Sequence, residues 1–349
     1  MSKRYDESGP DAGGWVQPGP GLRAAPTVWR EEGGPAASRP GGAAGRGEST
    51  LGEVFSPGGA HSHWAEWGAP KFLASDSPAA MLSELLQIGV HGFCFSQYLE
   101  GQAPGSQVSP EQIRARLDII RPHTRWVRSF SCTDGHEATP RIAHELGLKT
   151  LVGAWLGEDE AINEREIEGA IALARAGHVD LLAVGNEVLL REDIPEDRLI
   201  ANLDRVKQAV PGIPVGYVDA YYLFEKHPRV TAACDVIFTN CYPFWEGCPR
   251  DQAIAYMQSM VRRTQAAAPG KRVIVSETGW PHTGTPFHGA VPSVDGAVRY
   301  FVDTCRWAAR DRIELFYFAA FDEAWKIDAE GDVGAYWGLW DHRGLPKHF

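Results

Sequence analysis

Residues 236–244 read VIFTNCYPF, and residues 315–321 read LFYFAAF. Both stretches are largely apolar without a break, whereas a strand with one face in water alternates apolar and polar residues. Such runs are typical of strands that are covered on both faces, as the strands of a parallel sheet are. These two stretches therefore indicate an α/β fold with a parallel sheet.

Eight such runs follow one another along the chain, with amphipathic segments between them. Ser109 followed by Pro110 predicts the start of one helix, and further helices are expected over 160–176, 197–210, 251–268 and 295–310. Eight strand–helix units in about 240 residues are what a closed (β/α)8 barrel, a TIM barrel, requires. An open doubly wound sheet would usually carry a glycine-rich phosphate loop, and neither GxGxxG nor GxxxxGKS/T occurs. The strands are expected at Val90–Phe95, Trp126–Phe130, Lys149–Trp155, Asp180–Glu187, Ile213–Asp219, Asp235–Phe244, Arg272–Trp280 and Glu314–Asp322.

The first 60 residues differ in composition from the rest of the chain. Stretches such as EEGGPAASRPGGAAGRG at 31–47 are rich in Gly, Pro and Ala and lack apolar periodicity, which predicts a disordered tail. Residues 61–349 are then expected to form the barrel domain. The N-terminus has no apolar segment of the kind found in secretory signals, and no run approaches about 18 apolar residues. We therefore expect a cytoplasmic location and no membrane segment.

Composition argues against several classes of partner. A formal net charge of −11 disfavours a nucleic acid, which would require a basic patch, and is compatible with a neutral polysaccharide. The histidines are scattered, so neither a metal nor another cofactor is expected. Six cysteines without CxxC spacing are expected to be reduced, buried thiols, with one bridge between Cys241 and Cys248 as the alternative.

Two glutamates stand at the ends of predicted strands. The fourth run reads LLAVGNEVLL over 181–190 and places Glu187 at its tip, and the seventh reads VIVSETGWP over 273–281 and places Glu277 at its tip. Active-site groups of such barrels come from the C-terminal ends of strands, and strands four and seven nearly face each other across the mouth. Two carboxyl groups about 5–5.5 Å apart are the arrangement of a retaining glycosidase. Repulsion between them would leave Glu187 protonated as the acid/base and Glu277 charged as the nucleophile.

Further residues near strand ends are candidate contacts to a sugar. Asn186 would hydrogen-bond the hydroxyl beside the anomeric carbon, and the Tyr242 hydroxyl would orient Glu277. Rings that follow strands can stack on the apolar faces of sugars, with packing in the core as the alternative. The ring candidates are Trp155, Trp245 and Trp280, and the polar candidates, with a scaffold role as the alternative, are Tyr98, Arg128, Asp134 and Asp219.

GNEV at 185–188 and VSETGWP at 275–281 resemble the motifs of glycoside hydrolase family 17, especially of its bacterial members. The stretches GFCFSQYLEGQ, RSFSCTDG, LVGAWLG, YPFWEG and VGAYWGLWD are similar in style, so the resemblance extends from about Gly92 to Phe349. It implies a (β/α)8 barrel with the acid/base on strand four and the nucleophile on strand seven, which correspond to Glu187 and Glu277. EAWK at 323–326 resembles the family's ExxK, which implies that Glu323 and Lys326 line the cleft.

The family contains β-1,3-glucanases and β-1,3-glucanosyltransferases, so the resemblance implies double displacement on a β-1,3-glucan oligo- or polysaccharide without a cofactor. Water captures the glycosyl-enzyme in a hydrolase and a second sugar captures it in a transglycosylase; hydrolysis is the leading interpretation and transfer stays open. A non-catalytic glucan-binding barrel would lack one of the two glutamates. A barrel enzyme of another family, such as an isomerase, would need a phosphate site after strands seven and eight, and TGTP at 283–286 has one glycine and no basic residue.

Overall fold

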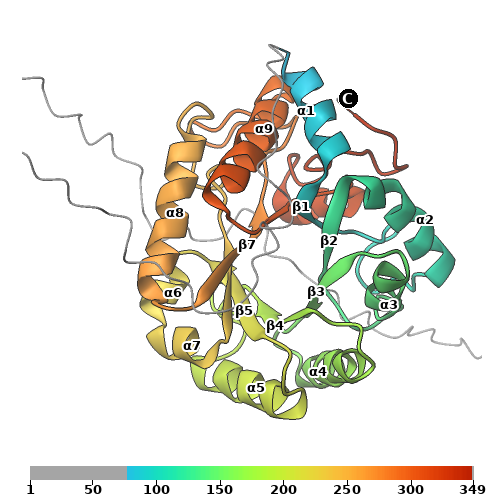
Figure 1. Ribbon diagram of the computed structural model, residues 1–349, viewed down its shortest axis with the longest axis vertical. Coiled ribbons are helices and arrows are strands. Elements are labelled where there is room, and N and C mark those ends of the chain that lie inside the picture. The colour runs from blue at the N-terminus through green and yellow to red at the C-terminus, as the bar shows by residue number, and fades with distance from the viewer. Residues whose placement is uncertain (1–76, 348–349) are drawn as a thin grey trace, which may run out of the picture.

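In the computed structural model, residues 77–347 are described, except for the side chains of residues 328 and 329 (Figure 1). The predicted tail over residues 1–60 lies outside the described residues and stays a prediction. So does the expected start of the barrel domain at residue 61. The described chain begins at the N-terminal end of the first helix.

The strands form a closed parallel barrel in chain order, which confirms the predicted fold. Each observed strand overlaps one predicted run, and a ring of helices surrounds the barrel (Figure 1). The first and last strands close the barrel through Gly92 with Phe316 and Phe93 with Tyr317. The strands are β1 (Val90–Cys94), β2 (Thr124–Ser129), β3 (Lys149–Ala154), β4 (Leu181–Asn186), β5 (Val215–Ala220), β6 (Val236–Asn240), β7 (Arg272–Thr278) and β8 (Leu315–Tyr317).

The last run is apolar well beyond its strand, for a reason the structure makes clear. β8 ends at Tyr317, although its run was predicted to continue to Asp322. Phe318 and Phe321 are nevertheless buried, at 5% and 1% exposure, because they pack between the loops that cover the barrel mouth. Burial at this end of the barrel thus extends past the regular hydrogen-bonded ladder, and continuous hydrophobicity overestimates the length of the strand.

Some helices of the outer ring begin at a residue whose side chain caps them. Ser109 Oγ accepts a hydrogen bond from the backbone N–H of Gln112, as expected of an N-cap before Pro110. Asp159 caps the fourth helix in the same way, through the N–H groups of Ala161 and Ile162. The helices are α1 (Pro78–Ile88), α2 (Pro110–Ile120), α3 (Ala138–Glu145), α4 (Glu160–Arg175), α5 (Glu196–Ala209), α6 (Leu223–Lys226), α7 (Pro228–Ala233), α8 (Ala253–Ala267), α9 (Val294–Asp311) and α10 (Ile327–Glu330), with 3-10 turns η2 (Arg121–His123) and η3 (Ala324–Lys326).

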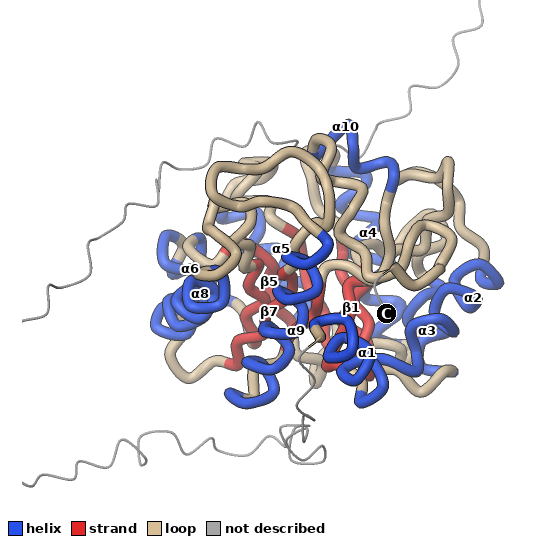
Figure 2. Tube along the Cα trace, turned by 90° about the horizontal axis from the view of Figure 1, so that it is seen from above, coloured by secondary structure: helices blue, strands red, loops and turns tan. Residues whose placement is uncertain are grey.

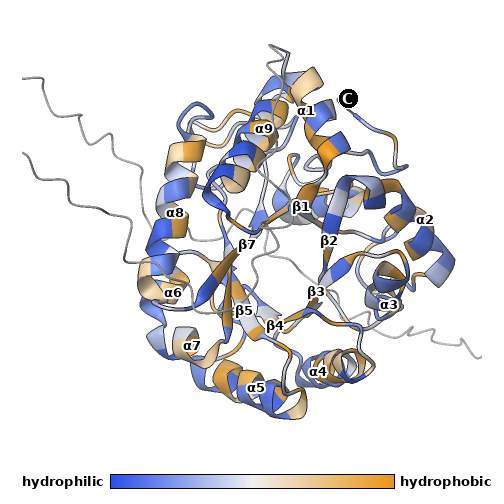
Figure 3. Ribbon diagram, in the orientation of Figure 1, coloured by the Kyte–Doolittle hydropathy of each residue, from blue (hydrophilic) through white to orange (hydrophobic). Residues whose placement is uncertain are grey.

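Hydrophobic and hydrophilic positions alternate along the ring helices, as amphipathic helices over a barrel require (Figure 3). All six cysteines are buried and free, which confirms the predicted thiols. The alternative bridge is wrong, because Cys241 and Cys248 are both unpaired. Within residues 77–347, no helix combines the length and hydropathy needed to cross a membrane.

Long loops gather on one side of the barrel, seen at the top of Figure 2. Because α10 follows β8 and lies on that side, these loops stand at the C-terminal ends of the strands (Figure 2). This is the end at which barrels of this kind place their active sites.

Candidate active site

The pairing of β4 and β7 is irregular just before the predicted glutamates. Between Ala183 and Asn186, β4 advances by three residues while its partner β5 advances by two. Between Val275 and Glu277, β7 advances by two residues while its partner β6 advances by one. An extra residue of this kind bends a strand and redirects its side chains, and such bulges are frequent beside active sites. The two strand tips that carry Glu187 and Glu277 are therefore both reshaped where the strands end.

The backbone of Glu187 adopts a left-handed conformation, with φ of 53°. This region is uncommon for a residue with a side chain and is found where the surroundings impose it. Here the N–H of Glu187 donates to Val218 O at 2.8 Å, and its carbonyl oxygen accepts from Arg191 N at 2.9 Å. The neighbouring strand and the following turn thus hold Glu187 at the tip of β4.

The side chain of Glu187 is joined to the seventh strand through Asn240. Asn240 Nδ2 donates to Glu187 Oε1 at 2.8 Å, and its Oδ1 accepts from Ser276 Oγ at 2.8 Å. The backbone of Asn240 is also paired with Glu277. Sequence reasoning missed Asn240 because it lies inside the apolar run VIFTNCYPF. Its only signal is that it is a polar residue at the tip of a barrel strand.

The surroundings of Glu187 favour its protonated form. Burial is the largest cause that raises the pKa of this carboxyl, and the negative charge of Glu277 raises it further. The hydrogen bond from Asn240 and the charge of Arg191 lower the pKa without reversing the shift. A carboxyl group with these neighbours is suited to hold a proton and to release it during a reaction.

The carboxylate of Glu277 is surrounded by donors. Arg128 Nη1 lies 2.5 Å from its Oε1, and the Tyr242 hydroxyl donates to its Oε2 at 2.7 Å. The contact expected of Tyr242 is therefore present. A buried guanidinium and a phenol at these distances stabilise the charged form of a carboxylate. The two glutamates thus meet opposite electrostatic surroundings at one end of the barrel.

The surroundings of Arg128 favour the scaffold role that was the alternative to a sugar contact. Its side chain is 2% exposed, and its guanidinium is bound to protein groups. Besides Glu277 it donates to Ser276 O at 3.1 Å and to Asn186 Oδ1 at 2.6 Å. Arg128 therefore holds Asn186 and Glu277 at fixed positions, and a sugar contact by Arg128 stays a prediction.

Two more candidates are turned into the protein interior, which favours the scaffold and packing roles that were their alternatives. Asp219, within β5, is fully buried, and its oxygens accept from Ala220 N at 2.7 Å and from the hydroxyl of Tyr217. Trp280, just after β7, is 1% exposed, donates its ring N–H to Val291 O at 3.1 Å and packs against Phe244. Sugar contacts by these two residues stay predictions.

For Trp245 and Asn186, the surroundings favour neither a sugar contact nor a purely structural role. Trp245 is half-buried, with its ring centroid 5.6 Å from that of Trp337 and 5.8 Å from that of Phe287. Asn186 is 6% exposed, and its Oδ1 is taken by Arg128. Sugar contacts by these two residues stay predictions.

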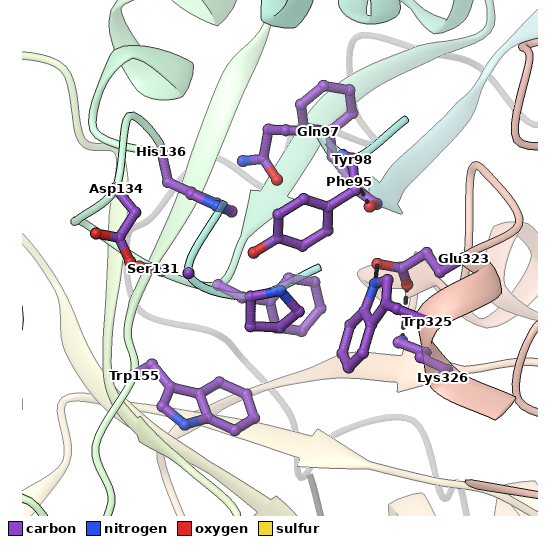
Figure 4. Close-up of a pocket in the computed structure, with 14 residues that line it drawn as sticks. Phe95, Gln97, Tyr98, Ser131, Asp134, His136, Trp155, Glu323, Trp325 and Lys326 are labelled. Carbon is purple, nitrogen blue, oxygen red and sulfur yellow. Dashed lines mark hydrogen bonds and ion pairs between the residues drawn. The ribbon is translucent and has the colours of Figure 1, made fainter. Parts of the chain in front are cut away.

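A cavity opens at the same end of the barrel, between the loops that follow β8, β1, β2 and β3 (Figure 4). It holds about 590 Å³, including space open to solvent. Rings of Tyr98, Trp155 and Trp325 surround it in Figure 4, with carboxylates and an ammonium group among them. The structure thus brings together the predicted residues Tyr98, Asp134, Trp155, Glu323 and Lys326 with Trp325, another ring that follows a strand, and adds Phe95, Gln97, Phe130, Ser131 and His136 among those that sequence reasoning missed.

Lys326 lines this cavity and interacts electrostatically with Glu277. Its ammonium group lies 2.7 Å from Glu323 Oε2 and 4.0 Å from the centroid of the Phe318 ring. Burial alone would lower the pKa of Lys326, but neighbouring carboxylates raise it, Glu323 foremost and Glu277 also. Lys326 therefore stays charged at the boundary between the cavity and Glu277. Within the described part of the chain, no group of three or more His, Cys, Asp or Glu residues could hold a metal ion.

Curated proteins similar to this chain act on glucan. A glucan 1,3-beta-glucosidase of Candida albicans is 28% identical over 255 residues, which cover 64% of this chain and 81% of that protein. A glucan 1,3-beta-glucosidase of Schizosaccharomyces pombe is 26% identical over 262 residues, which cover 70% and 82%.

Solved structures similar to this chain also include an enzyme that acts on β-1,3-glucan. The β-1,3-glucanosyltransferase of Rhizomucor miehei, a glycoside hydrolase of family 17, has a TM-score of 0.67 and 28% identity, covering 74% of this chain and 95% of its own. An active-site mutant of that enzyme is known in complex with laminaritriose. A β-galacturonidase of Eisenbergiella tayi, with a TM-score of 0.57 and 14% identity, shares the fold alone.

A further match is to a protein family. It is to the BtgE/BtgC glycoside hydrolase domain, and it runs over residues 92–338, from β1 to beyond α10. These residues include both strand tips with their glutamates and every loop that lines the cavity. Because the match spans well over half of its length, the chain belongs to the BtgE/BtgC glycoside hydrolase domain family.

Proposed function

We propose that this chain is a retaining glycoside hydrolase of family 17 that cleaves β-1,3-glucosidic bonds, with Glu277 as nucleophile and Glu187 as acid/base. One observation carries the proposal: two glutamates at the same end of the barrel have opposite surroundings. Arg128 and Tyr242 donate to Glu277, whereas burial and the charge of Glu277 raise the pKa of Glu187. A charged and a protonated carboxyl are the two groups that double displacement requires.

In the first step a carboxylate oxygen of Glu277 bonds to the anomeric carbon while the glycosidic C–O bond breaks. Glu187 gives its proton to the departing oxygen, so the leaving sugar departs as an alcohol. The ester at Glu277 is uncharged, so one cause of the raised pKa of Glu187 disappears. Glu187, now ionised, then takes a proton from water as the water oxygen attacks the anomeric carbon and releases Glu277.

The residues around this pair support binding of a sugar chain. Because Arg128 holds Oδ1 of Asn186, the Nδ2 amide is the donor that Asn186 offers to the hydroxyl next to the anomeric carbon. In the cavity, Trp155 supplies an aromatic face and Asp134 supplies hydrogen-bond acceptors. Glu323 and Lys326 complete the wall nearest Glu277.

The substrate and the family number rest on similarity. The relatives from Candida albicans and Schizosaccharomyces pombe are named for glucan 1,3-β-glucosidase activity, and the Rhizomucor miehei enzyme is a member of family 17. The likeness to bacterial members stays a prediction, because these three relatives are fungal.

Transfer to a second sugar is the alternative outcome at the same site. It is favoured by the similarity to the Rhizomucor miehei glucanosyltransferase, 95% of which is covered by this chain. Hydrolysis and transfer share every step until the glycosyl-enzyme is captured. They therefore differ only in whether products longer than the starting sugar accumulate.

The test combines two variants with a product profile. Wild-type protein and the Glu277→Ala and Glu187→Ala variants are incubated with β-1,3-gluco-oligosaccharides, and the products are sized by mass spectrometry. Glu277→Ala should lose turnover on every glycoside. Glu187→Ala should lose about 10²–10⁴-fold on oligosaccharides, keep activity on aryl glycosides with a good leaving group and be accelerated by azide. Rescue of Glu277→Ala by azide, and not of Glu187→Ala, would reverse the two roles.

The pH profile tests the same assignment. The acid must be protonated in the free enzyme, and the pKa of Glu187 is raised above its usual range. The wild-type kcat/KM should therefore fall as the pH rises through that raised pKa. In Glu187→Ala with an activated aryl glycoside, this fall should be absent.

A further inference from the structure

Glu166 lies on the inner face of α4 and is fully buried. Its Oε1 accepts hydrogen bonds from Ser131 Oγ and Thr133 Oγ1, both at 2.6 Å. Its Oε2 accepts from the backbone N–H of Cys132 at 2.8 Å and of Trp155 at 3.1 Å. Four donors from two different loops therefore converge on one carboxylate.

The two loops are those that form one wall of the cavity. Ser131 and Trp155 themselves line it, and Asp134 and His136 follow within the first loop (Figure 4). The first loop follows β2 and the second follows β3. Because hydrogen bonds to a charged group are shorter and stronger than neutral ones, a shared carboxylate fixes the spacing between the loops.

A glycine on the same helix makes this arrangement possible. A Cβ at Gly169 would lie 2.8 Å from Cys132 O and 2.9 Å from Cys132 Cβ. Any side chain at this position would push α4 away from the loop. Gly169 is one turn from Glu166, so the close approach of the helix and the reach of the carboxylate belong together.

Burial of this carboxyl group is costly, which argues that it has a function beyond filling space. Burial raises the pKa of Glu166, and the hydrogen bonds from Ser131, Thr133, Cys132 and Trp155 oppose that shift. An apolar side chain would avoid the cost of desolvation, but it could not hold hydroxyl and amide donors of two loops in one plane.

We propose that Glu166 is a positioning residue that fixes the cavity wall formed by the Ser131–Thr133 loop and Trp155, and thereby sets the length of glucan chain that the enzyme prefers. This inference rests on the proposed function. Glu166 touches no substrate itself. It acts by keeping the ring of Trp155 and the carboxylate of Asp134 at the separation that matches glucosyl units bound in the cavity.

The experiment measures kcat and KM for β-1,3-gluco-oligosaccharides of increasing length, together with the melting temperature. Glu166→Ala removes all four hydrogen bonds. Glu166→Gln keeps an oxygen for the two backbone N–H groups, while the Ser131 and Thr133 hydroxyls can rotate to accept from its amide. Glu314→Gln is the matched control, because the Glu314 side chain is only 13% exposed and hydrogen-bonded but lies at the opposite end of the barrel.

In Glu166→Ala, kcat/KM for the longest oligosaccharides should fall by about 10²-fold or less, through KM, while the shortest cleaved substrate changes little. Glu166→Gln should regain most of the length preference. Thr133→Val, which removes one donor that does not line the cavity, should give a smaller loss of the same kind. If Glu166→Ala fails to fold, the length preference of kcat/KM can still be compared among wild type, Thr133→Val and Glu166→Gln, and that comparison tests the proposal.

Three results would overturn the inference. Equal losses at every chain length in the Glu166 variants would reduce Glu166 to a stabilising residue. A change of length preference in Glu314→Gln would show that the profile follows stability and not the loops. Wild-type protein that leaves every oligosaccharide intact would overturn the proposed function as well, so the two failures are distinguishable.

Discussion

Glu314 directly precedes the eighth strand at the N-terminal end of the barrel, and Glu187 follows the fourth strand at the C-terminal end. Both residues are half-buried, but their partners differ. Arg272 Nε lies 2.6 Å from Glu314 Oε2, and His91 Nε2 lies 3.5 Å from its Oε1. Glu187 has Asn240 as hydrogen-bond partner and the charge of Glu277 nearby.

The pKa values of the two groups move in opposite directions as a result. Burial raises the pKa of Glu314, but the hydrogen bonds from His91 and Arg272 outweigh it and lower the pKa to about 2. The pKa of Glu187 is raised. Glu314 at the N-terminal end is held in its charged form, whereas Glu187 at the C-terminal end lies in surroundings that favour the proton. Such an arrangement is tolerated where reactivity requires it.

The largest effect should come from removing the cation at the C-terminal end. Arg128→Met leaves the buried Glu277 without the guanidinium that contacts it at 2.5 Å. The free energy of unfolding, measured by chemical denaturation at neutral pH, should fall by about 3–5 kcal/mol, because the remaining charge is buried.

Arg272→Met is the matched change at the N-terminal end. Arg272 is 38% exposed and Glu314 keeps His91, so the loss should be about 1 kcal/mol or less. Equal losses in the two variants would mean that the two ends do not differ in how their carboxylates are held.

A smaller effect concerns the pH dependence of stability. Burial and the charge of Glu187 raise the pKa of Asp219 from 3.8 to about 8. Between these values the folded protein binds more protons than the unfolded chain, so this group's contribution to stability is lost as the pH rises through about 8. Asp219→Asn should remove this loss and become more stable relative to wild type as the pH rises. The difference should be at most a few kcal/mol, at about 1.4 kcal/mol per unit of pKa.

Glu314→Gln should behave in the opposite way. The pKa of Glu314 is about 2, below its ordinary value of 4.5, so its stabilisation is present above that value and is lost as the pH falls toward 2. Denaturation curves collected from acid to mild alkali should separate the two variants, with Glu314→Gln flattening the acid side and Asp219→Asn removing a decline between about pH 4 and pH 8. Equal slopes for wild type and Asp219→Asn between these pH values would contradict the position given to Asp219.

The smallest effect separates two tryptophans that follow strand ends. Trp155→Ala should raise KM for β-1,3-gluco-oligosaccharides roughly threefold to tenfold, because an aromatic wall of the cavity is lost. Trp280→Phe should leave KM unchanged and lower the free energy of unfolding by about 1 kcal/mol, because the ring N–H of the buried Trp280 loses its hydrogen bond to Val291 O. The reverse result would favour Trp280 as a sugar contact.

The barrel and its two glutamates could be predicted because each depends on a local pattern. Uninterrupted apolar runs mark doubly covered strands, and a polar residue at the C-terminal end of such a run lies at the barrel mouth. Glu187 and Glu277 satisfy both conditions. The same rule also selected Trp280 and Asp219, because the position of a residue after a strand does not determine whether its side chain faces the mouth or the helices.

Other features depend on contacts between distant segments. Glu166 stands in an amphipathic helix among several other acidic residues, and only its orientation toward the loops of β2 and β3 distinguishes it. Asn240 is hidden within an apolar run, and its contact to Glu187 requires the neighbouring strands to be in register. The extra residues before the two glutamates likewise result from pairing between strands, which no single segment encodes.

The closure of the barrel has a consequence for the order of folding. β8 has three residues, and it meets β1 through two residue pairs, the most distant in sequence of all the strand pairings. Gly92 lets the ring of Phe316 lie against β1, since a Cβ there would be 2.5 Å from that ring. Contacts between such distant segments carry a large loop-closure entropy and tend to form late. Glu323 and Lys326 lie in the loop that follows this strand, so the cleft is completed only when β8 pairs with β1. We therefore expect chains in which this pairing has not formed to have no enzymatic activity.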